Sequence, residues 1–220
     1  MNLPNHERES NQFTGIANVI GVMDRGGDVI APGAFIDALA GFLDKGFIGL
    51  SHDWDSLPIA MPDTAEERAG GLWVSGTFHS TRAAQAARSV IRERLEKGLQ
   101  VGLSIGFRAD PADCIGFRSG ADLLVYARRE GLAGLDEAGI ADWRAPCRLV
   151  LRVAELFEVS IVAVPMNPES QVTHVKSPRL IRAAFEANVI RLALSLTRRR
   201  FREPLPSLDL AYGQIRHKSS

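Results

Sequence analysis

Cysteine is scarce in this sequence: Cys114 and Cys147 are the two in a chain of 220 residues. Two cysteines this far apart form neither a disulfide framework nor a close-spaced metal or redox motif, and they favour a reducing compartment. Apolar runs long enough to span a bilayer are also missing. The opening stretch, MNLPNHERESNQF, lacks the basic start and apolar core of a signal peptide. We therefore expect the protein to remain in the cytoplasm in which it is made.

A net charge is missing as well, because 26 basic residues balance 26 acidic ones. This balance predicts neither a nucleic-acid partner nor a membrane partner. The GxGxxG and P-loop patterns are absent, so a phosphate-cradling role has no support. The sequence therefore gives no reason to expect a cofactor.

Positive charge is nevertheless concentrated near the end of the chain. Between Lys176 and Glu203 there are eight basic residues and two acidic ones, a net charge of +6. Apolar residues recur at helical spacing through the same segment, at Ile181, Phe185, Val189, Leu192 and Leu196. We expect one domain over residues 1–175, followed over residues 176–220 by a basic helical tail that is partly flexible.

The remaining chain, in a sequence that is 45% hydrophobic, has the patterns of a mixed globular fold. Alternation of apolar and polar residues predicts strands over 13–22, 47–52, 72–78, 98–110 and 150–164. Proline, cap and glycine signals predict a short helix over 32–46 and a longer one from Ser80 or Thr81 to Gly98. Between residues 110 and 146 the pattern weakens, which predicts an insertion or a long surface excursion with one short helix near 136–143.

One serine stands out in the strand pattern GLQVGLSIGFRAD, residues 98–110. Apolar residues at the odd positions from 99 to 107 alternate with small or polar ones, so Ser104 lies on the face opposite to them. Gly102 and Gly106 flank it and would leave clearance for a substrate backbone. The structural alternative is that these glycines mark a bulge or tight packing and that the serine faces water.

Two other polar residues lie on strand-like segments. His52 shares its predicted face with the apolar residues of its strand, and Glu158 shares its face with Leu156, while Glu155 points to the opposite face. A buried carboxylate needs a partner. Because a histidine can take the proton of a serine hydroxyl and a carboxylate can orient that histidine, His52, Ser104 and Glu158 are candidates for a catalytic triad. The residues alone also fit a chance grouping.

Other residues give competing hypotheses. Asp53, beside His52, could bind a metal together with His79, but HDWD lacks the two-histidine spacing of helical zinc sites. His79 lies at a strand end before a helix cap, which fits a surface or capping residue. Cys114 and Cys147 could act as nucleophiles with His52, although plain thiols fit their irregular surroundings better.

Five sequence blocks resemble a known family when taken in order. They are FTGIANVIGVMDRGGDVIAPGAF, LSHDW followed by LP, GLWVSGTF, GLQVGLSIGFR and LFEVSIVAVPMNPES. Together they cover about residues 13–175 and resemble the prohead maturation proteases of tailed bacteriophages, a family similar in fold and mechanism to the herpesvirus capsid assembly protease. LSIGF and EVSIVAVPMNP are the most specific blocks. Met166 stands where the family more often has alanine, and residues 121–146 align with no motif.

The resemblance implies an α+β fold with a mostly antiparallel, barrel-like sheet and surrounding helices. It also implies a serine endopeptidase in which Ser104 is the nucleophile, His52 its base and Glu158 the residue that orients His52, whereas the herpesvirus enzymes use a second histidine in that last role. Backbone N–H groups over 106–108 would form the oxyanion site.

The implied substrates are scaffold segments of the major capsid protein and the protease itself. Cleavage would take place inside the immature capsid in the bacterial host cytoplasm, and a homo-oligomer is compatible with this function.

Two other functions fit the same residues. One is a non-catalytic module that binds scaffold or capsid protein and keeps the protease fold. The other is a metal-dependent hydrolase that uses His52, Asp53 and His79. For the basic tail, docking on scaffold or capsid protein and a solvated helix without a partner both remain open.

Overall fold

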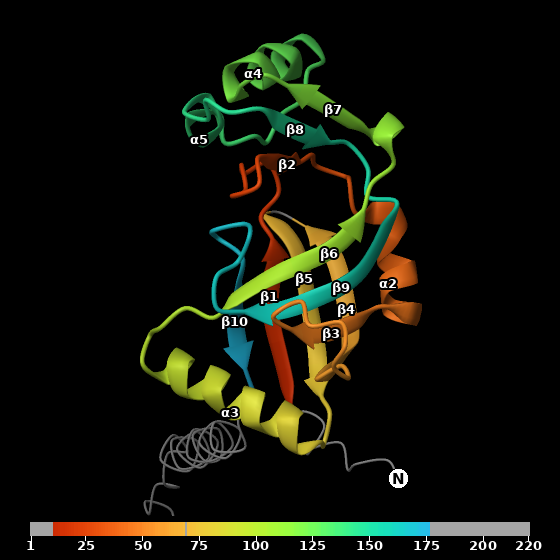
Figure 1. Cartoon of the computed structure of the whole chain (residues 1–220), viewed down its shortest axis with the longest axis vertical. Helices are drawn as coiled ribbons and strands as arrows, with labels where there is room; N and C mark the ends of the chain where they lie inside the picture. Colours follow the sequence, from red (N-terminus) through yellow and green to blue (C-terminus); the bar gives the residue numbers. More distant parts are fainter. Residues whose placement is uncertain (1–10, 69, 177–220) are drawn as a thin grey trace, which may run out of the picture. The chain divides into compact units, whose positions relative to one another are not determined.

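The computed structural model describes residues 11–68 and 70–176. In this part of the chain seven strands close into a barrel in the order β1-β10-β6-β9-β3-β4-β5 (Figure 1). Their bounds are β1 (Gln12–Asn18), β3 (Phe47–Leu50), β4 (Ala60–Arg68), β5 (Gly71–Phe78), β6 (Gly102–Arg108), β9 (Glu155–Val162) and β10 (Gln171–Val175). The α+β fold and the barrel-like sheet are confirmed. The predicted basic helix lies outside the described residues.

One neighbouring pair in the barrel is parallel. β3 runs parallel to β9, with Gly49 opposite Ser160, whereas the other barrel neighbours are antiparallel. Through this pairing β9 lies between β6 and β3, two strands that are far apart in sequence. This arrangement was not predicted, because alternation within a strand does not reveal its partners.

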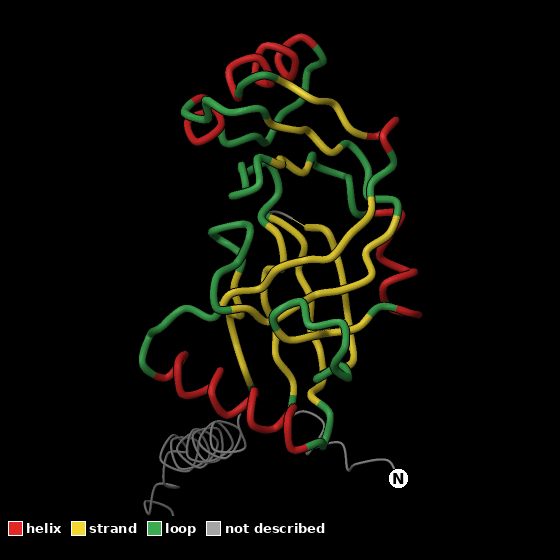
Figure 2. The backbone as a smooth tube through the Cα atoms, in the orientation of Figure 1, coloured by secondary structure: helices red, strands yellow, loops and turns green. Residues whose placement is uncertain are grey.

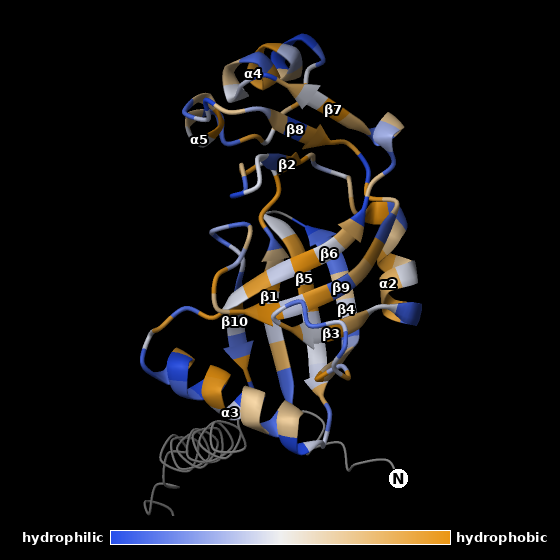
Figure 3. Ribbon diagram, in the orientation of Figure 1, coloured by the Kyte–Doolittle hydropathy of each residue, from blue (hydrophilic) through white to orange (hydrophobic). Residues whose placement is uncertain are grey.

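Apolar side chains fill the barrel. Fully buried members of the main cluster include Phe13, Phe35, Ile48, Leu72, Leu103 and Val159. The helix α3 (Arg82–Glu96) adds Ala84 and Ile91 to this cluster, and α2 (Leu39–Lys45), which follows the 3₁₀ turn η1 (Ile36–Ala38), adds Phe42. Figure 3 shows the apolar residues running along the barrel strands in orange. Residues that alternate with these core positions therefore lie on the outer face of the barrel.

The helix predicted to end at Gly98 is α3. Its first turn is capped by the Thr81 side chain, which accepts a hydrogen bond from the Ala84 N–H at 3.3 Å. Gly98 follows the helix with φ of +70° and donates its N–H to the Leu95 carbonyl at 2.9 Å. Both ends match the signals that predicted them.

A second, three-stranded sheet has the order β2-β8-β7 and consists of β2 (Asp28–Ile30), β8 (Cys147–Val150) and β7 (Cys114–Phe117). β7 follows the 3₁₀ turn η2 (Pro111–Asp113), and the connection from β7 to β8 contains α4 (Gly120–Arg129) and α5 (Glu137–Ala141). Met23, Val29, Leu123, Ile140 and Leu149 form its separate core. Residues 110–146 were predicted to be an insertion or a long surface excursion, and the surface excursion is wrong because this segment has a core of its own. The short helix predicted near 136–143 is confirmed as α5. Each of these short elements adds only a few core residues, so no single window carries a clear period.

The strand predicted over residues 150–164 is also wrong as one element. The chain leaves β8 after Val150, crosses to the barrel and begins β9 at Glu155. In this crossing, Val153 donates its N–H to the Ala34 carbonyl at 2.8 Å, and Ala154 donates to the Arg108 carbonyl at 2.9 Å. Apolar residues recur on both sides of the crossing, and within it Val153 is buried while Arg152 is exposed, so hydrophobicity alone does not mark the break.

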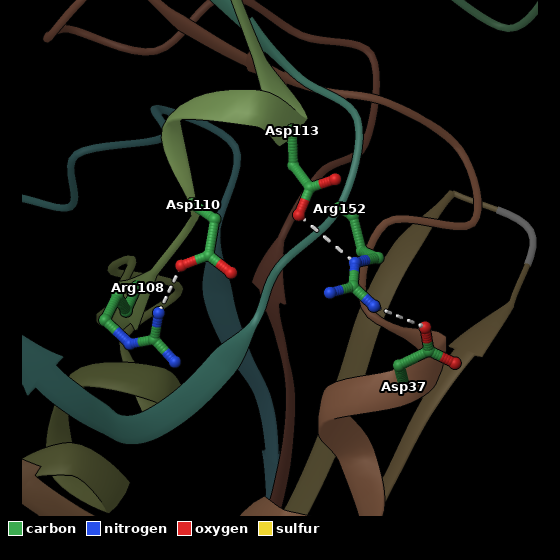
Figure 4. A network of polar contacts seen from close by, with 5 residues as sticks. All are labelled: Asp37, Arg108, Asp110, Asp113 and Arg152. Atoms are coloured by element: carbon green, nitrogen blue, oxygen red, sulfur yellow. Dashed lines mark hydrogen bonds and ion pairs between the residues drawn. The ribbon is translucent and has the colours of Figure 1, made fainter.

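Arg152 anchors this crossing to two other connections (Figure 4). Its Nε lies 3.2 Å from Asp113 Oδ2 in η2, and its Nη1 lies 3.4 Å from Asp37 Oδ2 in η1. Close by, Arg108 pairs with Asp110 at the end of β6. These exposed ion pairs contribute little individually, but the arginine ties together three segments where the chain passes between the two sheets.

Candidate active site

Ser104 lies in the middle of β6, directly opposite Ser160 of β9. Residues opposite each other in an antiparallel pair lie on the same face of the sheet. Leu103 packs in the barrel core on one side, so Ser104 and Ser160 share the outer face. The face opposite to the apolar residues was predicted correctly. The alternative that Ser104 faces water is wrong, because only 5% of the residue is exposed.

A β-bulge brings Glu158 onto the same outer face. Gly106 is opposite Glu158, but the next residue, Phe107, is opposite Leu156, which leaves Phe157 as the extra residue in β9. The bulge therefore puts Leu156 in the barrel core and Glu158 outside it. The prediction that these two residues share a face is wrong for this reason.

The same bulge changes the position of Glu155. Glu155 lies opposite Arg108, and Glu158 lies opposite Gly106. Arg108 and Gly106 are two residues apart on β6 and share a face, so both glutamates lie on that face as well. Opposite faces were predicted because the odd spacing was read without the extra residue. Glu155 is exposed and pairs with Arg108 at 3.6 Å, whereas Glu158 is completely buried.

His52 belongs to a turn, not to a strand. β3 ends at Leu50, and Asp53 donates its N–H to the Leu50 carbonyl at 3.1 Å. Ser51 and His52, the central residues, have φ of +57° and +56°, as in a type I′ turn. The prediction that His52 shares the face of the apolar residues of β3 is therefore wrong. The left-handed backbone ends the alternation and starts the loop of residues 51–59, drawn green between β3 and β4 in Figure 2.

This loop brings His52 to the carboxylate of Glu158. His52 Nδ1 lies 3.1 Å from Glu158 Oε2. Because Nδ1 faces the carboxylate, the other ring nitrogen, Nε2, is left to exchange a proton with another group. The ring is partly exposed, with 38% of the side chain accessible, while the carboxylate is fully covered.

Ser160 makes hydrogen bonds to both His52 and Glu158. Its Oγ accepts a hydrogen bond from the backbone N–H of His52 at 3.1 Å and donates one to Glu158 Oε1. One hydroxyl therefore fixes both the turn that carries the histidine and the carboxylate that contacts its ring. Ser160 is fully buried.

Trp54 is a further partner of the carboxylate. Its Nε1–H donates to Glu158 Oε2 at 2.6 Å, and its ring makes an edge-on contact with Phe157, with ring centroids 5.5 Å apart. The residue is 64% exposed, so core packing does not explain its position. Sequence reasoning missed Trp54, which no pattern marked, and missed Ser160, whose signal was a second hydroxyl two residues after Glu158.

The three candidate residues therefore come from three adjacent strands or their ends. The structure brings His52 and Glu158 into contact and puts Ser104 opposite the serine that binds both of them. No hydrogen bond joins the Ser104 side chain to His52 or to another side chain among residues 11–68 and 70–176. Ser104 is thus a buried residue on the outer face that also carries Glu158 and Ser160.

The two glycines beside Ser104 have a packing role. A Cβ at Gly102 would lie 2.7 Å from the Pro165 ring, and one at Gly106 would lie 2.7 Å from the Phe157 ring and 2.8 Å from Glu158 Oε2. The space above them is already occupied by these side chains. The prediction that the glycines leave clearance for a peptide is wrong, and tight packing explains them.

The competing metal site receives no support from the geometry. Within the described part of the chain, no three His, Cys, Asp or Glu side chains are placed to hold an ion together. The Asp53 carboxylate accepts hydrogen bonds from the Ser56 hydroxyl at 2.6 Å and the Asp55 N–H at 3.2 Å. The Ser56 bond lowers the pKa of Asp53, so this carboxylate stabilises the loop as an anion.

The described helices also include none long and apolar enough to cross a membrane.

The cysteines do not form an alternative centre. Cys114 and Cys147 are both free thiols at opposite ends of the β7–β8 pair, where their partners are Val150 and Phe117. Burial raises the pKa of both thiols, which disfavours the reactive thiolate. Plain structural thiols were the expected reading.

No family model matches the chain, and no solved structure matches it. The chain is similar to the prohead protease of Enterobacteria phage HK97, with 33% identity over 95 residues. The match covers 43% of this chain and 41% of the phage protein, so the chain matches about two fifths of the length of that relative. This likeness supports a relationship to phage prohead proteases. It does not extend to the herpesvirus protease fold.

Proposed function

We propose that this chain is a serine endopeptidase of phage prohead maturation. The observation that carries the proposal is the contact between His52 Nδ1 and the buried carboxylate of Glu158, on the same barrel face as Ser104. A histidine held this way is the usual partner of a serine nucleophile. The similarity to a prohead protease supports the same chemistry.

In the proposed reaction Ser104 Oγ attacks the scissile carbonyl carbon, and its proton passes to His52 Nε2. The proton then moves to the leaving amine as the peptide bond breaks, and water hydrolyses the acyl-enzyme by the same route. Glu158 holds the imidazole in one tautomer and stabilises its charged form. N–H groups over 106–108 are proposed as oxyanion donors.

Ser160 and Trp54 are proposed as positioning residues. Together with His52 they give the buried carboxylate of Glu158 three hydrogen-bonding partners, which offset the cost of removing its charge from water. A carboxylate fixed at both oxygens cannot rotate away from the histidine. The two residues would therefore act through Glu158 without contacting the substrate.

The proposed substrates are scaffold segments of the major capsid protein and the protease itself. These partners, and the site of action inside the immature capsid in the host cytoplasm, follow from the relationship to prohead proteases. A non-catalytic capsid-binding module with the same fold is the alternative that the experiment below separates.

The test uses the purified full chain, incubated alone and with the proposed capsid-protein substrate, with cleavage followed by mass spectrometry. Ser104→Ala should lower the cleavage rate by about 10³-fold or more. Asp53→Asn, one residue from His52, is the comparison variant; because Asp53 only stabilises the loop, it should lower cleavage far less than Ser104→Ala. Wild-type cleavage by Ser104→Ala contradicts the nucleophile. If Glu158→Gln cleaves at the wild-type rate while Asp53→Asn loses cleavage, Glu158 is not the carboxylate that orients His52.

Two further outcomes decide between classes of function. An intact mass for both proteins after long incubation supports the non-catalytic module. Inhibition by chelators, together with resistance to serine-directed reagents, supports the metal-dependent hydrolase.

A further inference from the structure

A groove of about 420 Å³ lies between α3 and the ends of three barrel strands. Ala87, Val90 and Ile91 line it from α3. Leu50 and Ser51 line it from the end of β3, and Val101 and Val162 line it from the strands β6 and β9 or their ends. Figure 1 shows α3 lying across this end of the barrel.

The groove adjoins the candidate active site through three chain segments. Ser51 immediately precedes His52 in the turn. On β9, Val162 lies two residues beyond Ser160, opposite Gly102, which is itself two residues before Ser104. Two residues of strand span about 6.6 Å, so the groove begins one residue pair away from the proposed nucleophile.

The lining of the groove is apolar and partly accessible. Leu50 is 43% exposed and Val90 is 57% exposed, although both are large apolar residues. Among the described residues that line the groove there is no carboxylate, and the cation among them, Arg94, donates hydrogen bonds from Nε and Nη2 to the Gln100 carbonyl at 3.3 and 3.1 Å. Because most of the lining side chains are aliphatic, the surface favours an apolar group.

We propose that this groove binds a large apolar side chain of the peptide substrate, within two residues of the scissile bond. The inference rests on the proposed peptidase function and adds a specificity site to it. An extended peptide advances at most about 3.6 Å per residue, so a peptide whose scissile carbonyl lies at Ser104 reaches Val162, which lines the groove, within two residues. Burying that side chain against the aliphatic lining supplies the binding energy.

The experiment compares cleavage profiles on a library of short peptides made from a denatured bacterial proteome, with sites identified by mass spectrometry. The full chain should select leucine, isoleucine, methionine or phenylalanine at one position within two residues of the cleaved bond. Val90→Trp fills the groove from an exposed helix position. It should lower kcat/KM at least about tenfold for these peptides and leave peptides with alanine or glycine there unchanged.

Val125→Trp is the matched control, because Val125 is 68% exposed on α4 and does not line the groove. Its cleavage profile should equal that of the wild type. A Val90→Trp profile identical to wild type, with cleavage that still depends on Ser104, overturns the specificity site and leaves the peptidase intact. A changed oligomeric state of Val90→Trp with an unchanged profile assigns the groove to contact between copies and also overturns the proposal. Absence of any cleavage that depends on Ser104 overturns the proposed function itself, and the substrate site with it.

Discussion

A single buried hydroxyl, that of Ser160, holds two elements of the site in register. It accepts a hydrogen bond from the His52 backbone N–H and donates one to the Glu158 carboxylate, so the turn and β9 are linked through one atom. Its removal would leave a carboxylate oxygen without its donor in a fully buried position, which costs about 1–3 kcal/mol. Ser160 therefore contributes to the site through Glu158 and His52, without contact with a substrate.

We expect Ser160→Ala to lower kcat by about tenfold or more with little change in KM, because Glu158 and His52 lose their common anchor while the groove stays intact. Steady-state kinetics on one cleaved peptide checks the split. Ser75→Ala, at a hydroxyl on β5 that binds Thr64, serves as the control for loss of a barrel serine. Equal losses of kcat in the two variants would mean that Ser160 has only a general structural role.

The residue scale also shows what the sequence leaves undetermined. Alternation was sufficient to assign Ser104 to the outer face, because β6 is regular around it. Alternation failed for His52, because Ser51 and His52 begin a turn with left-handed backbone conformations that their residue types do not predict. Non-glycine residues in this conformation cost about 1–3 kcal/mol each and are held by their surroundings, here the Ser160 hydroxyl and the carboxylate.

Among the elements, β9 depends most on a local irregularity. The extra residue at Phe157 reverses the alternation, so that the carboxylate of Glu158 lies over Gly106 while Leu156 reaches the core. Gly106 is the position on β6 that this arrangement requires to have no side chain.

We expect Gly106→Ala to destabilise the fold by about 1–3 kcal/mol and to lower the cleavage rate further, because the new methyl group displaces Glu158 Oε2 or the Phe157 ring. Gly116→Ala is the matched control, since a Cβ at that strand glycine meets nothing within 4 Å. Thermal unfolding and peptide cleavage measure the two effects. A Gly106→Ala enzyme with wild-type cleavage would show that Glu158 tolerates displacement.

Elements with their own local signals were predictable. The helix α3 has a capping residue and a terminal glycine, and β5 has continuous alternation. The strand β4 was missed because Pro62 and several charged residues interrupt any pattern, and its pairing with β5 holds it in place. Tertiary contact also decides the β8–β9 break, so local sequence could not locate it.

At the scale of the described molecule, two hydrophobic clusters are separate. The barrel has one, and the sheet of β2, β7 and β8 has the other, with α4 and α5 packed on it. The His52–Glu158 pair and Ser104 belong to the barrel, while the second sheet contributes none of them. The two parts should therefore respond separately to loss of core packing.

We expect Leu123→Ala to destabilise the second sheet by about 2–5 kcal/mol, because Leu123 is fully buried in its core. Hydrogen exchange should rise over residues 114–150 and stay unchanged over β5 and β9. Val125→Ala, on the exposed side of α4, is the control and should leave exchange unchanged. A uniform rise over both sheets would mean that they unfold as one unit.

The parallel pairing of β9 with β3 has a consequence for synthesis of the protein. β9 lies between β6 and β3 in the barrel but is made long after both, so a nascent chain that ends before Glu155 lacks the strand that joins them. Such a chain also lacks Glu158 and Ser160, the residues that hold the turn at His52. The site is thus complete only after translation has passed residue 162, and truncated products cannot contain an assembled centre.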